Sequence, residues 1–297
     1  LISFSGGRTS AYMTYFILKH LKHKYNDIQI VFANTGKERE ETLEFIKKTQ
    51  EHFKWNVHWV EAITNPKNGI GVRAKIVDFK TADRQGKLYE DMIAKHGIPN
   101  MTTPHCTREM KAQAIRAFAR DFLKWKRKDY FTAIGYRADE PKRIDRIKQK
   151  KENLFYPLFD LHRVGKSDIN KFWLKNMPFD LELKSFEGNC DLCWKKSLRK
   201  IMTMLKHKPE LADWYIDMEA KYEMYVPETR ANQNEKPPIR IFQEYNSIHD
   251  LLHDAQNTDF IEAIDESKEY DKFKQIDMFD EYLDTEIGCA GSSCEVF

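Results

Sequence analysis

Two sets of residues in this chain of 297 residues have types and spacing suited to chemistry: a glycine turn near the start and five cysteines. Ser5, Gly6 and Gly7 follow an apolar run, and Ser10 begins a stretch with apolar residues at helical spacing. A strand, a glycine turn and a helix N-terminus together present unpaired N–H groups to a ligand, and the helix dipole favours an anion there. The spacing therefore predicts an anion site at residues 5–10.

The cysteines are Cys106, the C-x-x-C pair Cys190 and Cys193, and Cys289 and Cys294 near the C-terminus. Their odd number, in a long chain without a secretory pattern, argues against a disulfide framework. Thiolates favour soft metals, and C-x-x-C places two sulfurs on one side of a tight turn. The pair alone is compatible with a bound metal, with a redox dithiol or with unreactive thiols.

Composition limits the class of protein. Lysine and arginine total 49 against 46 aspartates and glutamates, which argues against a histone-like binder but leaves local basic patches open. No apolar run has transmembrane length and no signal-peptide pattern opens the sequence, so we expect a cytoplasmic protein without a membrane partner. Because Leu1 already lies within a strand pattern, we also expect residues upstream of it.

Strand and helix patterns alternate over the first two thirds of the sequence. Strands are predicted at 28–36, 55–62 and 129–137, and helices at 40–53 and 107–125. This order predicts an α/β fold with a parallel sheet, helices on both faces, and ligands at the carboxyl ends of the strands. The turns at 5–10, 34–37 and 135–143 fall at such ends. After about Cys190, helical patterns replace the strands.

The loop and four further motifs resemble the phosphoadenylyl-sulfate (PAPS) reductase family of the PP-loop, adenine-nucleotide α-hydrolase-like superfamily. The motifs are SFSGGRTSA, FANTGKEREETLEF, GYRADEPKR, FYPLFDL and CDLCWKKS, in the order that the family has them. The resemblance covers roughly two thirds of the chain and implies a Rossmann-like nucleotide-binding domain at 1–197. Residues 198–297 would then form a mainly helical C-terminal extension with a cysteine-containing tail.

The resemblance implies roles for the matching residues. Arg137 and Arg143 would clamp phosphate or sulfate oxygens, for which the planar guanidinium is well suited. Thr9 replaces the family's usual Asp, which weakens the case for ATP cleavage; Mg²⁺ would then be held by Asp139, Glu140 or the substrate. The adenine nucleotide would be bound by Ser5, Gly6, Gly7, Arg8, Thr9, Ser10, Thr35, Gly36 and Gly135.

The resemblance also implies different roles for two groups of cysteines. Cys106, Cys190 and Cys193 match positions that hold a [4Fe–4S] cluster in iron–sulfur members, which favours a cluster over zinc. The fourth ligand would be Cys289, Cys294, His105 or a non-protein sulfur. The tail around Cys289 and Cys294 approximates a motif that carries a catalytic cysteine in PAPS reductases; incidental thiols are the alternative.

Two enzymatic functions follow from the resemblance. The first is reduction of adenylyl sulfate or PAPS to sulfite, with a tail cysteine as nucleophile and a thiol reductant such as thioredoxin. The second is ATP-dependent sulfur transfer to tRNA or DNA by an ATP pyrophosphatase-type enzyme, with a sulfur donor such as a cysteine desulfurase. For the second, the basic stretches 122–131 and 142–151 would contact nucleic acid. A non-enzymatic nucleotide-sensing module is a third class.

Overall fold

The computed structural model describes residues 1–228, 230, 236–242 and 247–269. Its sheet has the strand order β4-β3-β2-β1-β5-β6, and all neighbours pair in parallel except β3 and β4. The predicted α/β fold with a parallel sheet is confirmed. The sequence analysis did not predict the antiparallel edge strand β4. The strands are β1 (Ile2–Ser3), β2 (Ile30–Asn34), β3 (Val57–Ile63), β4 (Arg73–Val77), β5 (Thr132–Ala133) and β6 (Leu154–Phe155).

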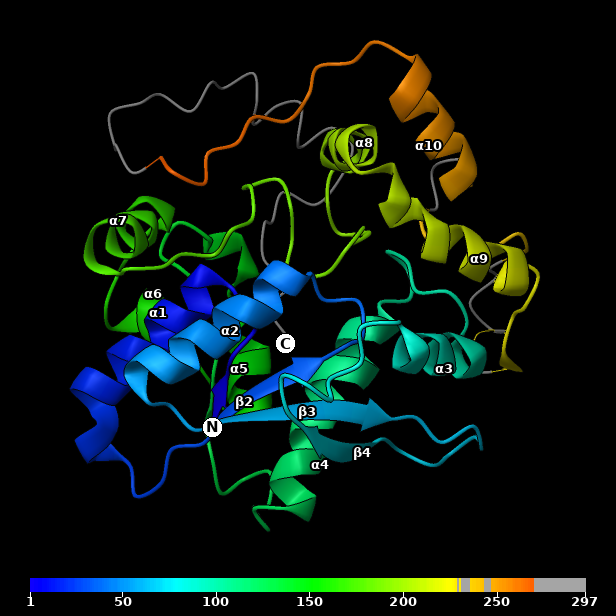
Figure 1. The fold of residues 1–297 in the computed structure, drawn as a ribbon. Helices are drawn as coiled ribbons and strands as arrows, with labels where there is room; N and C mark the ends of the chain where they lie inside the picture. The colour runs from blue at the N-terminus through cyan, green and yellow to red at the C-terminus, as the bar shows by residue number, and fades with distance from the viewer. Residues whose placement is uncertain (229, 231–235, 243–246, 270–297) are drawn as a thin grey trace.

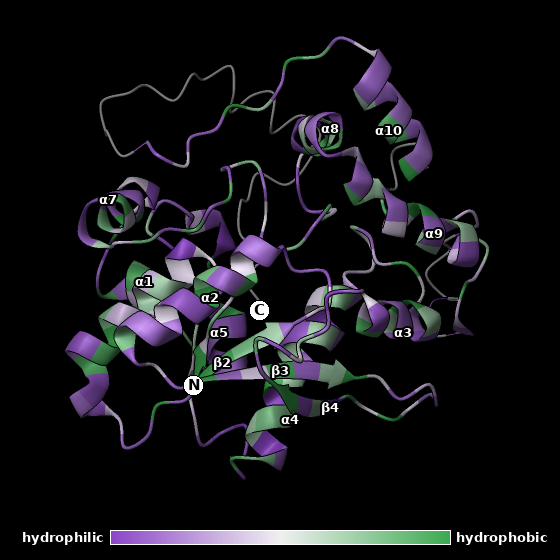
Figure 2. Ribbon diagram, viewed as in Figure 1, coloured by the Kyte–Doolittle hydropathy of each residue, from purple (hydrophilic) through white to green (hydrophobic). Residues whose placement is uncertain are grey.

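Helices cover both faces of this sheet (Figure 1). Alternate residues of β2 point to opposite faces: Ile30 and Phe32 pack with apolar residues of α1, α2 and α7, whereas Val31 and Ala33 pack with α3 and α4. In Figure 2 the central strands carry many of the hydrophobic colours. The helices of this part are α1 (Arg8–Phe16), continued by the π-helix η1 (Ile17–Leu21), α2 (Glu40–Phe53), α3 (Lys87–His96), the π-helix η3 (Cys106–Ala112), α4 (Gln113–Asp121), α5 (Arg146–Glu152), α6 (Pro157–Asp160) and α7 (Lys166–Asn176).

The C-terminal extension shares a core with the sheet. Its helices are α8 (Leu198–His207), α9 (Asp213–Tyr222) and α10 (Ile248–Asn257). Ile201, Tyr215 and Leu251, one from each helix, belong to the same buried cluster as Met92 of α3 and Ile115 of α4. No helix among the described residues is long and apolar enough to cross a membrane.

After α10 the chain runs back to the sheet domain, as the orange trace in Figure 1 shows. Ala263 N–H donates to Thr203 Oγ1 (2.9 Å), and Ser185 N–H donates to Asp265 Oδ1 (2.8 Å). The Asn170 amide of α7 donates to Glu269 O (2.8 Å). The last described residues therefore lie beside α7 and the segment around Ser185.

Candidate active site

Ser10 closes the loop between β1 and α1. Its Oγ accepts hydrogen bonds from Ser5 N–H (3.2 Å) and Ser5 Oγ (3.0 Å), and donates to Gly7 O (3.0 Å). Gly7 is the N-cap of α1 without a side-chain cap, and the first turn of the helix contains no acidic residue. The helix N-terminus is therefore available to an anion, as the sequence predicts.

Gly6 lets this loop rest directly on α2. Its φ is +81°, and a Cβ at this position would lie 2.7 Å from Thr42 Cγ2 and 2.8 Å from Ile46 Cδ1. An L side chain is disfavoured by both the backbone conformation and the close approach. Gly6 therefore positions the backbone N–H groups that follow it.

A cavity of about 100 Å³ opens beside the loop. Arg137 reaches it from beyond β5: its side chain is 9% exposed, Nη1 lies 3.5 Å from Thr9 Oγ1, and Nε donates to Asp139 Oδ1 (2.8 Å). The structure thus brings the loop and Arg137 together. The described lining consists of Ser5, Gly7, Arg8, Thr9, Arg137, Lys166, Asn170, Leu181, Leu183, Lys184, Ser185, Glu187, Gly188, Asn189 and Ser267.

The other two predicted arginines have protein partners. Arg8 Nε and Nη2 donate to the two carboxylate oxygens of Asp180 (2.6 and 2.7 Å), and Nη2 also donates to Leu181 O (2.9 Å). Arg8 lines the cavity while holding this segment in place. Arg143 donates to Glu140 Oε1 (2.8 Å) and is not among the described residues that line the cavity.

Thr35, Gly36 and Gly135 lie at the carboxyl edge of the sheet, outside the described cavity lining. Thr35 Oγ1 donates to Glu38 Oε1 (3.0 Å). Gly36 has a φ of +76°, and a Cβ there would lie 2.4 Å from Asp83 Oδ2, so the chain around Asp83 covers this turn. Gly135 is buried two residues after β5 ends.

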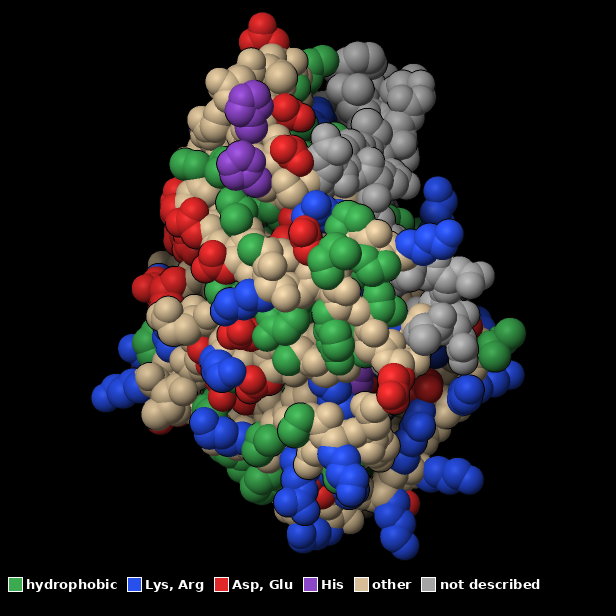
Figure 3. All heavy atoms as spheres, turned by 90° about the vertical axis from the view of Figure 1, so that its right-hand side faces the viewer, with side chains coloured by type: hydrophobic (Ala, Val, Ile, Leu, Met, Phe, Trp, Pro, Cys, Tyr) green, Lys and Arg blue, Asp and Glu red, His purple; other side chains and the backbone are tan. Residues whose placement is uncertain are grey.

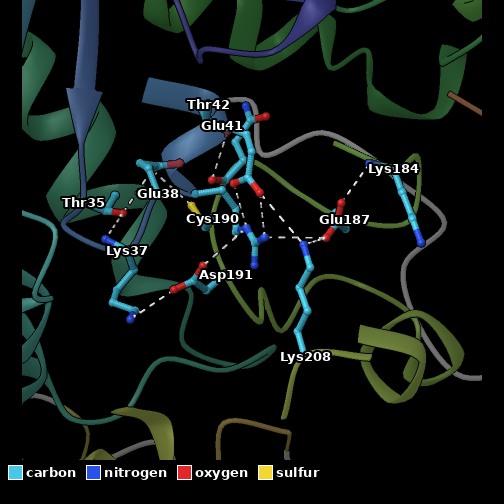
Figure 4. Close-up of polar contacts among 12 residues, drawn as sticks. Thr35, Lys37, Glu38, Glu41, Thr42, Lys184, Glu187, Cys190, Asp191 and Lys208 are labelled. Atoms are coloured by element: carbon cyan, nitrogen blue, oxygen red, sulfur yellow. Dashed lines mark hydrogen bonds and ion pairs between the residues drawn. The ribbon is translucent and has the colours of Figure 1, made fainter. Parts of the chain in front are cut away.

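The C-x-x-C segment lies along the residues that follow β2 (Figure 4). Glu38 and Cys190 form an antiparallel bridge, Arg39 N–H donates to Asn189 O (2.6 Å), and Asp191 N–H donates to Lys37 O (2.9 Å). The Asn189 amide also donates to Ser5 O (2.8 Å). Asn189, which bonds to the anion loop, directly precedes Cys190, so the loop and the C-x-x-C segment are neighbours.

A charged network fixes this alignment. Arg39 forms ion pairs with Glu41 (3.0 Å), Glu187 (3.7 Å) and Asp191 (3.9 Å), and Lys208 at the end of α8 pairs with Glu187 (2.7 Å). Figure 4 shows Glu41, Glu187, Asp191 and Lys208 of this network beside Cys190. The network joins the chain after β2, the C-x-x-C segment and the C-terminal extension.

Cys190 lies between two buried charges. Its thiol donates to Glu38 Oε1 (3.1 Å), and Lys111 Nζ lies 3.4 Å from the sulfur and 3.0 Å from the same carboxylate oxygen. The side chains of Lys111 and Glu38 are 7% and 0% exposed. Lys111 belongs to η3, the helix that begins at Cys106, so the two cysteine-bearing segments meet here.

Two buried tyrosines, Tyr215 and Tyr89, lie near the described thiols. Burial raises the pKa of Tyr215 well above its usual value, and nearby acidic groups that include Cys106, Cys190 and Cys193 raise it further. Burial likewise raises the pKa of Tyr89, with Cys106 and Cys193 contributing. Among the described residues, no group of three or more His, Cys, Asp or Glu side chains is arranged to hold one metal ion. Cys289 and Cys294 lie outside the described residues.

His105 is buried next to Cys106. Burial, followed by the nearby positive groups Arg108, His96 and Arg230, lowers the pKa of His105 to about 3. Its Nδ1 lies 3.0 Å from Arg108 Nη2, and its buried Nε2 has no hydrogen-bond partner among the described residues. The ring is therefore neutral at physiological pH, the form in which histidine binds metals.

Sequence reasoning missed the site residues contributed by distant segments. Lys166 and Asn170 of α7 line the cavity, and Glu38 and Lys111 flank Cys190. Two of them have a signal in the sequence: Glu38 lies within the motif FANTGKEREETLEF, and Lys166 follows shortly after FYPLFDL.

Together the fold and the loop define a nucleotide-binding α/β protein of the PP-loop kind. Residues 1–162 match the model of the phosphoadenosine phosphosulfate reductase domain. The chain therefore belongs to the PAPS reductase family, which confirms the resemblance for the four motifs within residues 1–162; CDLCWKKS lies outside the matched residues.

Two known proteins are similar to this chain. An uncharacterized nin region protein of Escherichia phage lambda is 34% identical over 205 residues, which are 68% of this chain and 67% of that protein. An uncharacterized protein of Methanocaldococcus jannaschii is 22% identical over 225 residues, 73% of this chain but 46% of that protein. The chain thus spans less than half of the archaeal relative. No solved structure matches it.

Proposed function

We propose that this protein reduces the sulfate group of adenylyl sulfate or PAPS to sulfite in the cavity beside residues 5–10. The observation that carries the proposal is the pairing of Thr9 with Arg137. Related loops have an acidic residue at this position, whereas here the uncharged Thr9 faces the guanidinium of Arg137. A site with donors and positive charge suits a nucleotide bound as an anion.

The two carboxylates that the sequence suggests for Mg²⁺, Asp139 and Glu140, support the same proposal. Asp139 accepts hydrogen bonds from Arg137 Nε (2.8 Å) and Lys166 N–H (2.9 Å). Glu140 accepts from Arg137 N–H (3.1 Å) and Arg143 Nη1 (2.8 Å). Mg²⁺ bound to a pyrophosphate takes carboxylate oxygens as ligands. The carboxylate oxygens of Asp139 and Glu140 already accept hydrogen bonds from Arg137, Arg143 and Lys166. The arrangement favours a sulfonucleotide over Mg²⁺-bound ATP.

In the proposed reaction, the N-terminus of α1 and Arg137 hold the phosphate and orient the sulfate group. The thiolate of Cys289 or Cys294 attacks the sulfate sulfur, and the sulfur–oxygen bond breaks with its electron pair leaving on the nucleotide phosphate. A second thiol, from the tail or from a reductant such as thioredoxin, then attacks the cysteine sulfur. Sulfite leaves, a disulfide remains, and the sulfate sulfur has gained two electrons.

The path of the extension supports a role for the tail. Ser267, 4% exposed, lines the cavity together with Ser5 and Arg137. The described chain ends shortly afterwards at Glu269, which is bonded to α7. The described part of the extension therefore reaches the cavity wall and ends beside α7.

We further propose that Cys106, Cys190 and Cys193 hold a [4Fe–4S] cluster, which would supply a soft-metal centre beside the anion loop. Thiolate ligands of a cluster bind different iron atoms and surround it, whereas zinc needs its ligands around one point. All three thiols influence the pKa of Tyr215, and no group among the described residues is arranged around a single ion, which supports a cluster over zinc.

ATP-dependent sulfur transfer to nucleic acid is the second candidate. It is supported by the proximity of the two basic stretches: the amide of Asn153, just after the second stretch, donates to Arg127 O of the first (3.4 Å). In Figure 3, Lys and Arg side chains gather at the end of the molecule to which α4 extends. Most of these stretches precede β5 and β6, at the strand ends opposite the loop at 5–10. Nucleic acid bound there would not reach the cavity directly, so reduction remains the preferred function.

The proposal is tested by offering anaerobic full-length protein ATP, adenylyl sulfate and PAPS separately, each with a dithiol reductant. We expect sulfite with AMP from adenylyl sulfate, or sulfite with adenosine 3′,5′-bisphosphate from PAPS. The Cys289→Ser and Cys294→Ser variants identify the nucleophile by loss of sulfite. AMP and pyrophosphate from ATP, with no sulfite from either sulfonucleotide, would replace reduction by the ATP-dependent function.

A further inference from the structure

A second cation in the cavity is paired with a carboxylate from the C-terminal extension. Lys166, the first residue of α7, lines the same cavity as Ser5, Gly7 and Arg137. Its Nζ forms an ion pair with Glu266, and the two side chains are 35% and 32% exposed. The pair is therefore accessible to solvent, and its lysine lines the cavity.

Lys166 and Arg137 are held as a unit by Asp139. One carboxylate oxygen of Asp139 accepts from Arg137 Nε (2.8 Å) and the other from Lys166 N–H (2.9 Å). Arg137 in turn contacts Thr9 on the first turn of α1. Two further cations, Arg8 and Lys184, belong to the described lining, and Arg8 is paired with Asp180. Lys166 is the lysine that Asp139 links to Arg137, so these two residues provide neighbouring positive centres. Two positive centres suit a ligand with two linked anionic groups.

The segment that carries Glu266 is held mainly by polar contacts. Ser185 N–H donates to Asp265, Glu266 N–H donates to Ser185 Oγ (2.8 Å), and the Asn170 amide donates to Glu269 O (2.8 Å). Ile261 and Ile264 are each 58% exposed. Of residues 262–269, Ala263 packs in the core cluster, whereas the others bury little apolar surface and open at low cost compared with the core.

We propose that Lys166 binds the outer anionic group of the nucleotide, which is the group beyond the α-phosphate. When the cavity holds no nucleotide, Lys166 forms its ion pair with Glu266 instead. The inference rests on the proposed nucleotide site. The Glu266 carboxylate and a sulfate or phosphate group are both oxyanions that compete for one ammonium. Nucleotide binding and the Lys166–Glu266 pair therefore exclude each other, and occupancy of the cavity loosens residues 262–269.

Calorimetric binding of AMP and adenylyl sulfate to full-length anaerobic protein tests this competition. Glu266→Gln removes the competitor and should tighten adenylyl sulfate about two- to fivefold, the range expected for a half-exposed ion pair. Lys166→Ala should weaken adenylyl sulfate about tenfold, and in that background Glu266→Gln should have no effect. AMP, which lacks the outer group, should bind all of these variants alike. Lys171→Ala, an exposed lysine on α7 outside the cavity lining, is the matched control.

Hydrogen exchange gives a second measurement. Adenylyl sulfate, but not AMP, should speed exchange of the amides in 262–269, and Glu266→Gln should raise their exchange without nucleotide. If Lys166→Ala and Glu266→Gln leave adenylyl sulfate affinity unchanged while Arg137→Lys weakens it, this inference is wrong and the nucleotide site stands. If Arg137→Lys also has no effect, the proposed site itself is wrong.

Discussion

The packing of Gly6 on α2 yields a stability prediction that can be worked from the structure. In Gly6→Ala, the φ of +81° costs an L residue about 1–2 kcal/mol. The new Cβ, 2.7 Å from Thr42 and 2.8 Å from Ile46, adds an overpacking cost of about 1–3 kcal/mol. We therefore expect a loss of about 2–5 kcal/mol in the free energy of unfolding, measured by urea denaturation followed by circular dichroism. Nucleotide affinity should fall as well, because the loop that presents the N–H groups must shift.

Gly69 provides the matched control for this substitution. Its φ is +79°, but a Cβ there would meet no atom within 4 Å. Gly69→Ala should therefore show the backbone cost alone, about 1–2 kcal/mol. The difference between the two variants isolates the contact between the loop and α2. Equal losses in Gly6→Ala and Gly69→Ala would refute that contact and the positioning of the loop argued from it.

The remaining predictions concern the anion clamp and the cysteines. Arg137→Lys keeps the charge but loses the planar fork, so adenylyl sulfate should bind about tenfold more weakly by calorimetry. The control Arg163→Lys, at an exposed arginine, should leave the affinity for adenylyl sulfate unchanged. Equal effects of the Arg137 and Arg163 substitutions would place the clamp elsewhere. Anaerobic protein should show iron–sulfur absorbance that Cys190→Ser removes and Cys289→Ser retains. Loss of the absorbance in Cys289→Ser would instead make that tail cysteine a cluster ligand.

Regular spacing made much of the fold predictable. The helix predicted at 40–53 is α2, Glu40–Phe53, because its apolar positions such as Leu43 and Ile46 recur at one buried face. The helix predicted to Trp125 ends earlier, at Asp121, and Lys124 has a φ of +61°. Strand β4 escaped prediction because it is a short edge strand in which only Ala74 and Val77 are buried.

The site was predictable where sheet topology fixes neighbours. Strands β1 and β5 pair in parallel, so the loop after β1 and Arg137 after β5 emerge at one edge. No comparable rule predicts the contacts that depend on the path of the C-terminal extension. The Arg8–Asp180 and Lys166–Glu266 pairs join residues 172 and 100 positions apart, and neither motif nor periodicity indicates them.

The extension contributes to both halves of the candidate site. Tyr215 of α9 lies against the described thiols, and the Lys37 ammonium, bonded to Asp191 (3.1 Å), lies 4.9 Å from the ring centre of Trp214. Ser267 reaches the cavity wall. A parallel sheet alone leaves its carboxyl edge open to water, whereas a covered site strengthens electrostatic contacts with an anion and protects a reactive sulfur intermediate from hydrolysis. Because Trp214 and Tyr215 of the extension also pack in the core of the sheet, binding at the site and order in the extension are expected to be coupled.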